Sequence, residues 1–182
     1  MDRVLDKTRA GWRHGWDTFH CAALIAAISC LSDSCGSSKA PAASMDGSTA
    51  ACNAVVDDGP LVTMTAVASA APSPVGGTIA DGTYVLSAAT LYTGPGGSTA
   101  ASGGAFSGVF QIKGTTMLQV GTVSGKEERY VTTFTTSGTT LSTNDTCPVA
   151  KSETHSFSAN PTGFTVYDAT GNGTFEQAYT KR

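Results

Sequence analysis

Beyond the first twenty positions, residues that could do chemistry are sparse. His155 is the only histidine in that part of the sequence. A serine–histidine–aspartate triad could use it, because Ser and Asp are plentiful. The Gly-x-Ser-x-Gly turn that exposes a nucleophilic serine is missing, however. A lone histidine in a strand-like segment such as 153–157 is more often a half-exposed surface residue. The sequence therefore predicts no catalytic residue and favours a protein that is not an enzyme.

Metal and cofactor sites also lack their usual patterns. Zinc sites draw on three or four protein ligands, which one histidine and a pair of disulfide-bonded cysteines would not supply. Residues 168–173 lack the alternating acidic residues and the distal glutamate of a calcium loop. The adjacent acidic pairs Asp57-Asp58 and Glu127-Glu128 are typical of solvated turns and would point to opposite faces of a strand. We therefore predict no metal and no cofactor.

The first 29 residues have the layout of an export signal. Residues 1–20 contain four basic side chains and three aspartates, and residues 21–29 carry no charge. This uncharged stretch fits the apolar core of a signal peptide, and it is far shorter than the roughly 20 apolar residues of a membrane-spanning helix. We therefore expect residues 1–29 to form a signal peptide.

The end of this segment suggests lipid attachment. Ala27-Ile-Ser-Cys30 resembles the lipobox of bacterial lipoproteins, which implies that Cys30 is acylated on its sulfur and on its new amino terminus. Cys35 is the alternative lipidation site, and an ordinary signal peptidase cut near residues 40–42 is a third possibility. Since two or more acyl chains anchor a protein stably, the expected partner of the N-terminus is a membrane.

The rest of the chain divides into a tether and one folded domain. Residues 30–51 are rich in Ser, Ala, Gly and Pro without apolar periodicity, which predicts a flexible tether. Residues 52–182 contain short segments in which apolar and polar residues alternate between turn residues. Nine segments are expected as strands: residues 62–67, 83–92, 106–113, 116–123, 129–136, 139–143, 153–159, 164–168 and 174–180.

The short links between these segments predict an all-β domain with antiparallel neighbours. About eight consecutive hairpin strands most simply close into a small up-and-down barrel, which removes exposed edges. A two-sheet β-sandwich is the alternative. The formal net charge of −3 and the lack of a basic stripe argue against a nucleic-acid partner.

Short motifs in this domain resemble known proteins. The run Asp81-Gly-Thr-Tyr-Val-Leu86, the hairpins after it, Cys147-Pro148 and the aromatic last strand resemble small lipoproteins of myxobacteria and related Gram-negative bacteria. The Gly-x-(Tyr/Trp) entry strand also resembles calycin or lipocalin-like barrels. These resemblances imply a bacterial cell-envelope location, at the outer membrane or the periplasmic face, together with a barrel fold.

Three of the five cysteines bear on how the domain is held together. We expect Cys52 and Cys147 to form a disulfide that closes a loop of about 95 residues, which would stabilise the domain by about 4–5 kcal/mol. Two buried free thiols are the alternative. The lipobox motif favours Cys30 as the lipid site, whereas an even cysteine count after processing favours Cys35.

Aromatic residues on nearly every expected strand could line a binding site, although the simpler interpretation is that they fill the barrel core. The residues expected to line a ligand site are Tyr84, Phe106, Phe110, Tyr130 and Phe134. The first hypothesis is a lipid-anchored, non-enzymatic envelope protein that binds a small apolar ligand or an envelope component. The second is a structural or protein-interaction module with a filled core, and an envelope hydrolase is the third. The sequence leaves the oligomeric state open.

Overall fold

A computed structural model describes residues 52–100 and 104–182. The expected signal peptide (1–29), the tether (30–51) and both candidate lipidation sites, Cys30 and Cys35, lie outside the described residues. In the described part of the chain no helix is long and apolar enough to cross a membrane.

The described chain forms ten strands, and the sequence-based segments correspond to them closely. The strands are β1 (Val62–Thr63), β2 (Thr65–Val67), β3 (Gly82–Tyr92), β4 (Ala105–Lys113), β5 (Thr116–Val123), β6 (Lys126–Ser137), β7 (Thr140–Cys147), β8 (Lys151–Asn160), β9 (Gly163–Thr170) and β10 (Gly173–Lys181).

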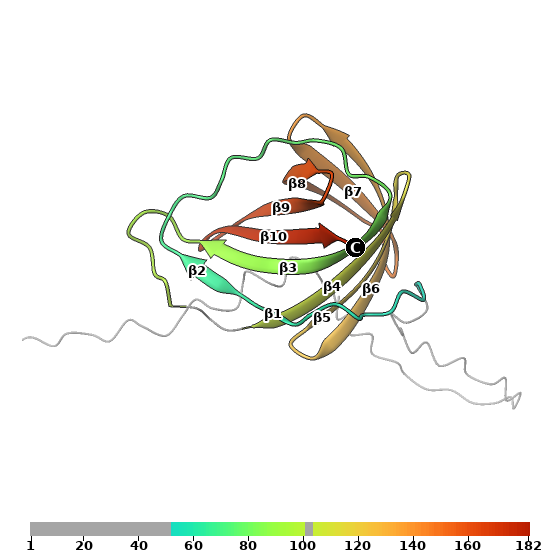
Figure 1. The fold of residues 1–182 in the computed structure, drawn as a ribbon, viewed down its shortest axis with the longest axis horizontal. Helices are drawn as coiled ribbons and strands as arrows, with labels where there is room; N and C mark the ends of the chain where they lie inside the picture. Colours follow the sequence, from blue (N-terminus) through green and yellow to red (C-terminus); the bar gives the residue numbers. More distant parts are fainter. Residues whose placement is uncertain (1–51, 101–103) are drawn as a thin grey trace, which may run out of the picture. The chain divides into compact units, whose positions relative to one another are not determined.

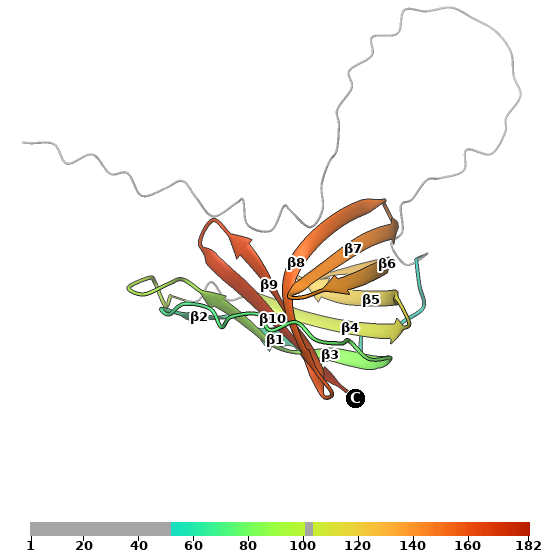
Figure 2. The same ribbon diagram turned by 90° about the horizontal axis from the view of Figure 1, so that it is seen from above.

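Strands β3 to β10 close into an antiparallel up-and-down barrel. Each strand from β4 to β10 pairs with its neighbour in sequence, and β3 pairs with both β10 and β4. Figure 1 shows β3 lying between β10 and β4, and Figure 2 shows the same strands from above, wrapped around a common interior. The predicted barrel is confirmed, and the alternative sandwich is not formed.

The expected strand 62–67 is divided at Met64 into β1 and β2. Strand β3 pairs with β4 only from Gly82 to Val85, so the two strands separate beyond that point. There β2 pairs in parallel with β3 and β1 pairs antiparallel with β4. The buried side chain of Met64 joins the core between them. Residues 62–67 therefore complete the wall where β3 and β4 diverge.

One half of the barrel interior is filled by aromatic rings. We call Tyr84, Phe110, Phe164 and Tyr179 the aromatic cluster. The rings of Phe164 and Tyr179 stack with centroids 4.9 Å apart, and Phe110 meets Tyr179 edge-on at 4.8 Å. The cluster lies toward the end that carries the β4–β5, β6–β7 and β8–β9 turns. Gly76 pairs with Ser158 at this end, and Ile79 is buried in the same core.

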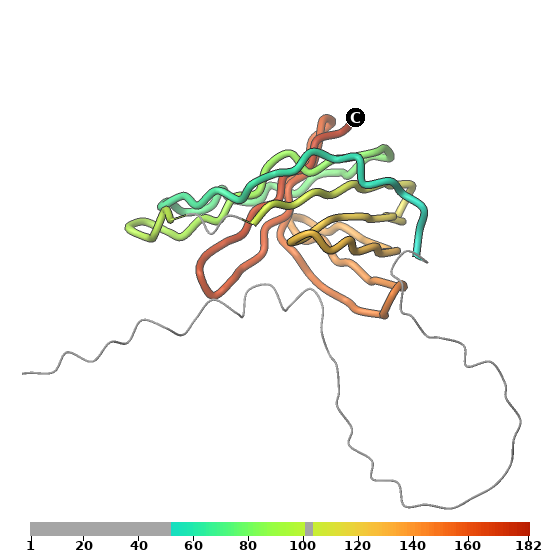
Figure 3. Tube along the Cα trace, turned by 90° about the horizontal axis from the view of Figure 1, so that it is seen from below, coloured from blue at the N-terminus to red at the C-terminus, as the bar shows by residue number. Residues whose placement is uncertain are grey.

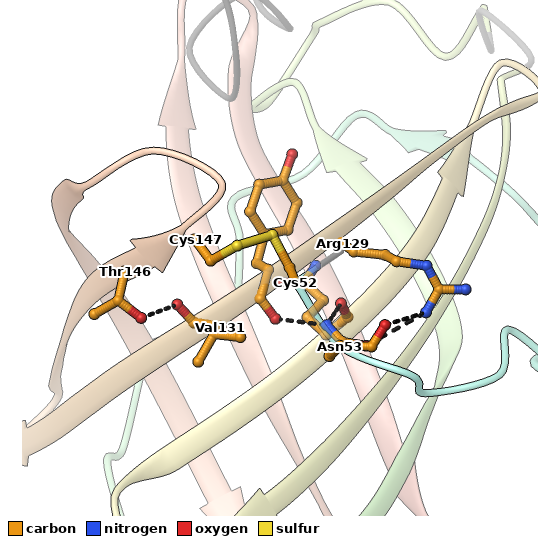
Figure 4. Close-up of a disulfide and its surroundings, with 8 residues drawn as sticks. Cys52, Asn53, Arg129, Val131, Thr146 and Cys147 are labelled. Carbon is orange, nitrogen blue, oxygen red and sulfur yellow. Dashed lines mark hydrogen bonds between the residues drawn. A yellow bond between two sulfur atoms is a disulfide. The ribbon is translucent and has the colours of Figure 1, made fainter. Parts of the chain in front are cut away.

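The segment before β1 forms a strap on the outside of the barrel, residues 52–60, which Figure 3 shows in teal. A disulfide joins Cys52 to Cys147 at the end of β7, as expected from the sequence (Figure 4). The Asn53 side-chain amide donates to the carbonyl oxygens of Gln119 and Tyr130, each at 2.9 Å. The side chain of Val55 is buried against the exterior of β4 and β5. The strap thus covers apolar side chains that would otherwise face solvent.

The disulfide gives a first test of the fold. Replacing both Cys52 and Cys147 with alanine is expected to lower the free energy of unfolding by up to about 4–5 kcal/mol, because the bond restricts a long loop in the unfolded chain. The 95-residue separation of the two cysteines sets this size. Urea denaturation of the variant and the oxidised wild type measures the difference. Equal stability of the two proteins would contradict the expectation, and added reductant should leave the variant unaffected.

Candidate ligand-binding site

Toward the other end of the barrel, which we call its polar half, polar side chains of β6 to β9 line one side of the interior, and Leu91, Phe106 and Phe175 of β3, β4 and β10 are also buried there. On β8, Lys151, Glu153 and His155 alternate with exposed residues and share a face with Phe157, which is fully buried. On β7, Thr143 and Asp145 share the face of the buried Leu141. Strand side chains alternate between faces, so these residues point inward with the core.

We call these inward-facing residues and their partners on β6 and β9 the polar cluster. Its members come from four consecutive strands, and cross-strand pairing brings Thr132 opposite Asp145 and Thr143 opposite Glu153. The full set is Tyr130, Thr132, Thr143, Asp145, Lys151, Glu153, His155 and Asp168.

His155 is at the centre of the polar cluster. Its Nδ1 lies 2.6 Å from Oδ1 of Asp168 on β9, and its Nε2 lies 3.4 Å from the hydroxyl oxygen of Thr143 on β7. The imidazole is only 11% exposed, which differs from the half-exposed surface position that its sequence context suggests. The histidine therefore connects two neighbouring strands through the interior of the barrel.

The surroundings of His155 favour its protonated form. Burial is the largest influence and by itself lowers the pKa. The hydrogen bond and negative charge of Asp168, together with the charges of Glu153 and Asp145, outweigh burial and raise the pKa of His155 above its ordinary value of 6.5. The carboxylates of the polar cluster thus favour the protonated imidazole of His155.

The other carboxylates at this end of the barrel have partners from the chain. Asp145 accepts a hydrogen bond from the Thr132 hydroxyl at 2.6 Å, and Glu153 lies 2.7 Å from the Lys151 ammonium. Glu128 accepts a hydrogen bond from the Tyr130 hydroxyl at 2.9 Å. Burial, and then the bond to Glu128, raises the pKa of Tyr130 far above its ordinary value, so the phenol stays protonated and donates.

One carboxylate oxygen of the polar cluster has no partner. Oδ2 of Asp168 is buried and makes no hydrogen bond within the described chain, although Oδ1 of the same side chain accepts from His155. A comparable atom, Oδ1 of Asp57, lies under the strap outside the barrel, where Oδ2 of Asp57 accepts from Ser107 and Thr122. Of these two oxygen atoms, only the Asp168 oxygen faces the barrel interior, where it is an acceptor without a donor.

Thr143, His155 and Asp168 form a hydroxyl–imidazole–carboxylate series, which is the arrangement of a nucleophilic triad. Acyl transfer also needs donors for the oxyanion, most often backbone N–H groups. β7 is paired with β6 on one side and β8 on the other around Thr143, so its backbone groups are engaged in the sheet. The backbone groups of β7 around Thr143 are therefore not available as oxyanion donors.

The five residues that were expected to line a ligand site lie in different parts of the structure. Tyr84 and Phe110 belong to the aromatic cluster, and Phe134 is buried in the same core. Tyr130 joins the polar cluster. Phe106 is also buried, near the opposite end of β4 from the aromatic cluster.

The main functional residues that sequence reasoning missed are Thr143, Asp145, Glu153 and Asp168. A signal was present, because Asp145 and Glu153 lie an even number of residues from the core residues Leu141 and Phe157. With a side-chain period of two, this spacing places each pair on one face of its strand. Carboxylates that share parity with core residues are thus expected to point inward.

Among residues 52–100 and 104–182, no three His, Cys, Asp or Glu side chains are grouped so that they could hold a metal ion. No protein-family model, curated protein or solved structure matches this chain.

The coupling of His155 to Asp168 can be measured directly. The NMR-monitored pKa of the His155 imidazole is expected above 6.5, and Asp168→Asn is expected to lower it, because burial then acts with less opposition. With a raised folded-state pKa, the pairing stabilises the fold fully below pH 6.5 and loses this effect as the pH rises through the folded-state pKa. Asp58→Asn, on the strap, serves as the control. An unchanged His155 pKa in Asp168→Asn would refute the coupling.

Proposed function

We propose that this protein is a non-enzymatic binding module that holds a small ligand in the polar half of its barrel. The observation that carries the proposal is the inward-facing polar cluster around His155. Small barrels are stable when apolar side chains fill their interior, whereas burying charged groups costs stability unless they are well paired. Titratable groups with shifted pKa values gather at functional sites more often than elsewhere.

The ligand that suits this interior has an apolar body and a polar head. The aromatic cluster fills one half of the barrel, and the polar cluster offers hydrogen-bonding groups in the other half. This refines the expectation of a small apolar ligand, because a polar head can form hydrogen bonds with groups of the polar cluster. It also favours binding over a structural module with a filled core, because buried charged groups cost stability unless they are well paired.

We further propose that the domain is tethered by a lipid to the bacterial cell envelope. The lipobox-like motif at Cys30 and the signal-like residues 1–29 support this location. The Cys52–Cys147 disulfide is consistent with it, since such bonds persist in oxidising compartments outside the cytoplasm.

Lipid attachment is tested by intact-mass analysis of the protein recovered from bacterial membranes. The wild type is expected to carry the added mass of three acyl chains, and Cys30→Ala is expected to lose it together with membrane association. Cys35→Ala is the matched control and should retain both. Acylation that survives in Cys30→Ala but disappears in Cys35→Ala would move the anchor to Cys35, and no acylation in any form would refute the tether.

Binding inside the barrel is tested by a thermal-shift screen of small amphiphiles followed by calorimetry. A ligand at about 100 times its Kd should stabilise the fold by about 2.7 kcal/mol. Thr143→Trp, which fills the polar half, is expected to abolish the shift. Thr154→Trp places the same ring on the exposed face of β8 and should leave it intact. Ligands that stabilise both variants equally would place binding elsewhere, and a screen without any stabilising compound would refute the proposed function.

A further inference from the structure

We infer that the Cys52–Cys147 disulfide is a redox switch that holds the strap, residues 52–60, against the barrel. Reduction by a dithiol frees the strap from the outer face of β4 and β5 and leaves the ring of strands closed. This switch acts on the exterior of the barrel and does not depend on a ligand in its interior, so it goes beyond the proposed binding function.

The disulfide is not part of the ring of strands. Ring closure comes from β3, which pairs with both β10 and β4. Cys52 precedes all the strands of the described chain, and Cys147 is the last residue of β7. Residues 52–60 contain no strand, so no ladder of backbone hydrogen bonds joins the strap to the sheet. Breaking the disulfide therefore leaves the strand pairings of the ring in place.

The disulfide is open to attack by a dithiol, because both cysteines are partly exposed (Figure 4). A thiolate of the dithiol attacks one sulfur and forms a mixed disulfide, and the released cysteine takes up a proton. The second thiol of the dithiol then attacks the mixed disulfide, closes its own disulfide and frees the other cysteine. The dithiol is thus oxidised, and its two electrons and two protons end on the two cysteines.

Without the disulfide, polar contacts at the surface provide most of what holds the strap. The Asn53 side-chain amide donates to two carbonyl oxygens of the barrel, and Arg129 donates to the carbonyl oxygens of Asn53 and Val55. Such bonds contribute little net stability, because water replaces each partner when the strap leaves. Val55 is the only buried residue of the strap. Little apolar burial therefore opposes the conformational entropy that the strap regains on release.

The two aspartates of the strap add little to this hold. Oδ2 of Asp57 accepts hydrogen bonds from the hydroxyl groups of Ser107 and Thr122, but Oδ1 is buried without a partner in the described chain. A carboxylate oxygen that loses water without gaining a donor costs free energy, and release of the strap returns it to water. The ion pair of Asp58 with Arg182 is exposed and contributes little. The disulfide thus keeps in place a segment whose own contacts include a penalty.

Release of the strap changes the outside of the barrel in two ways. Val109 and Val120, which are 1% and 0% exposed, lose the cover of Val55. The chain before Cys52 also changes its point of attachment, from the end of β7 to the start of β1. The redox state of one bond therefore sets both the apolar surface of the exterior and the place at which the preceding chain leaves the barrel.

The switch is tested on the full-length protein by NMR, in the oxidised form and after treatment with dithiothreitol. Nuclear Overhauser effects between the methyl groups of Val55 and Val120 are expected in the oxidised protein and should disappear on reduction. Those between the rings of Phe110 and Tyr179, inside the barrel, should remain. Val55–Val120 effects that persist after reduction would overturn the switch. Loss of the Phe110–Tyr179 effects would overturn it as well, because the ring would then depend on the disulfide.

A variant without the bond separates the loss of the disulfide from other effects of the reductant. The double variant Cys52→Ser and Cys147→Ser is expected to lack the Val55–Val120 effects with or without dithiothreitol and to keep the Phe110–Tyr179 effects. Cys35→Ser removes a thiol but retains the disulfide, so this matched control should respond to reduction as the wild type does. A double variant that keeps the Val55–Val120 effects would show that the strap stays in place without the bond, contrary to the switch.

Discussion

The structure depends on one strand that takes part in two pairings. β3 pairs with β10 along most of its length and with β4 over Gly82–Val85, and these contacts turn a meander into a closed ring. Closure gives every strand of the ring an inner and an outer face, because side chains alternate. Where β3 and β4 diverge, β1 and β2 complete the wall, so the ring stays continuous although its two end strands separate. The residues of the polar cluster face an enclosed interior only because this ring is closed.

Much of the fold could be predicted from the sequence, because its signals are local. The alternation of apolar and polar residues between turn residues indicated the strands. The short links between the strands required antiparallel neighbours, and a barrel of consecutive hairpins follows from this pairing. The Cys52–Cys147 bond was predictable as well. The division of residues 62–67 at Met64 was not, since it depends on where β3 and β4 separate, which is a property of the whole ring.

The candidate site was much harder to predict, because its contacts depend on the register between neighbouring strands, which the sequence alone does not give. His155 meets Thr143 and Asp168, each 12 or 13 residues away, and only the register between β7, β8 and β9 brings them together. The expectation of aromatic lining residues followed composition, and four of the five named aromatics belong to the buried core. Parity along each strand carried information about which carboxylates point inward, but register decides which of them meet.

The aromatic cluster and the polar cluster lie toward different ends of the interior, so packing and the proposed binding draw on different residues. Phe110, Phe164 and Tyr179 supply packed rings at one end, and the outer strap adds a disulfide and buried apolar contacts at Val55. The other end can then hold charged groups whose burial would be unfavourable in a barrel built for stability alone. Asp168 lies opposite Phe175 in the β9–β10 pairing, accepts a hydrogen bond from His155, and contributes through its charge to the raised pKa of Tyr179. The same carboxylate therefore acts on residues of both clusters.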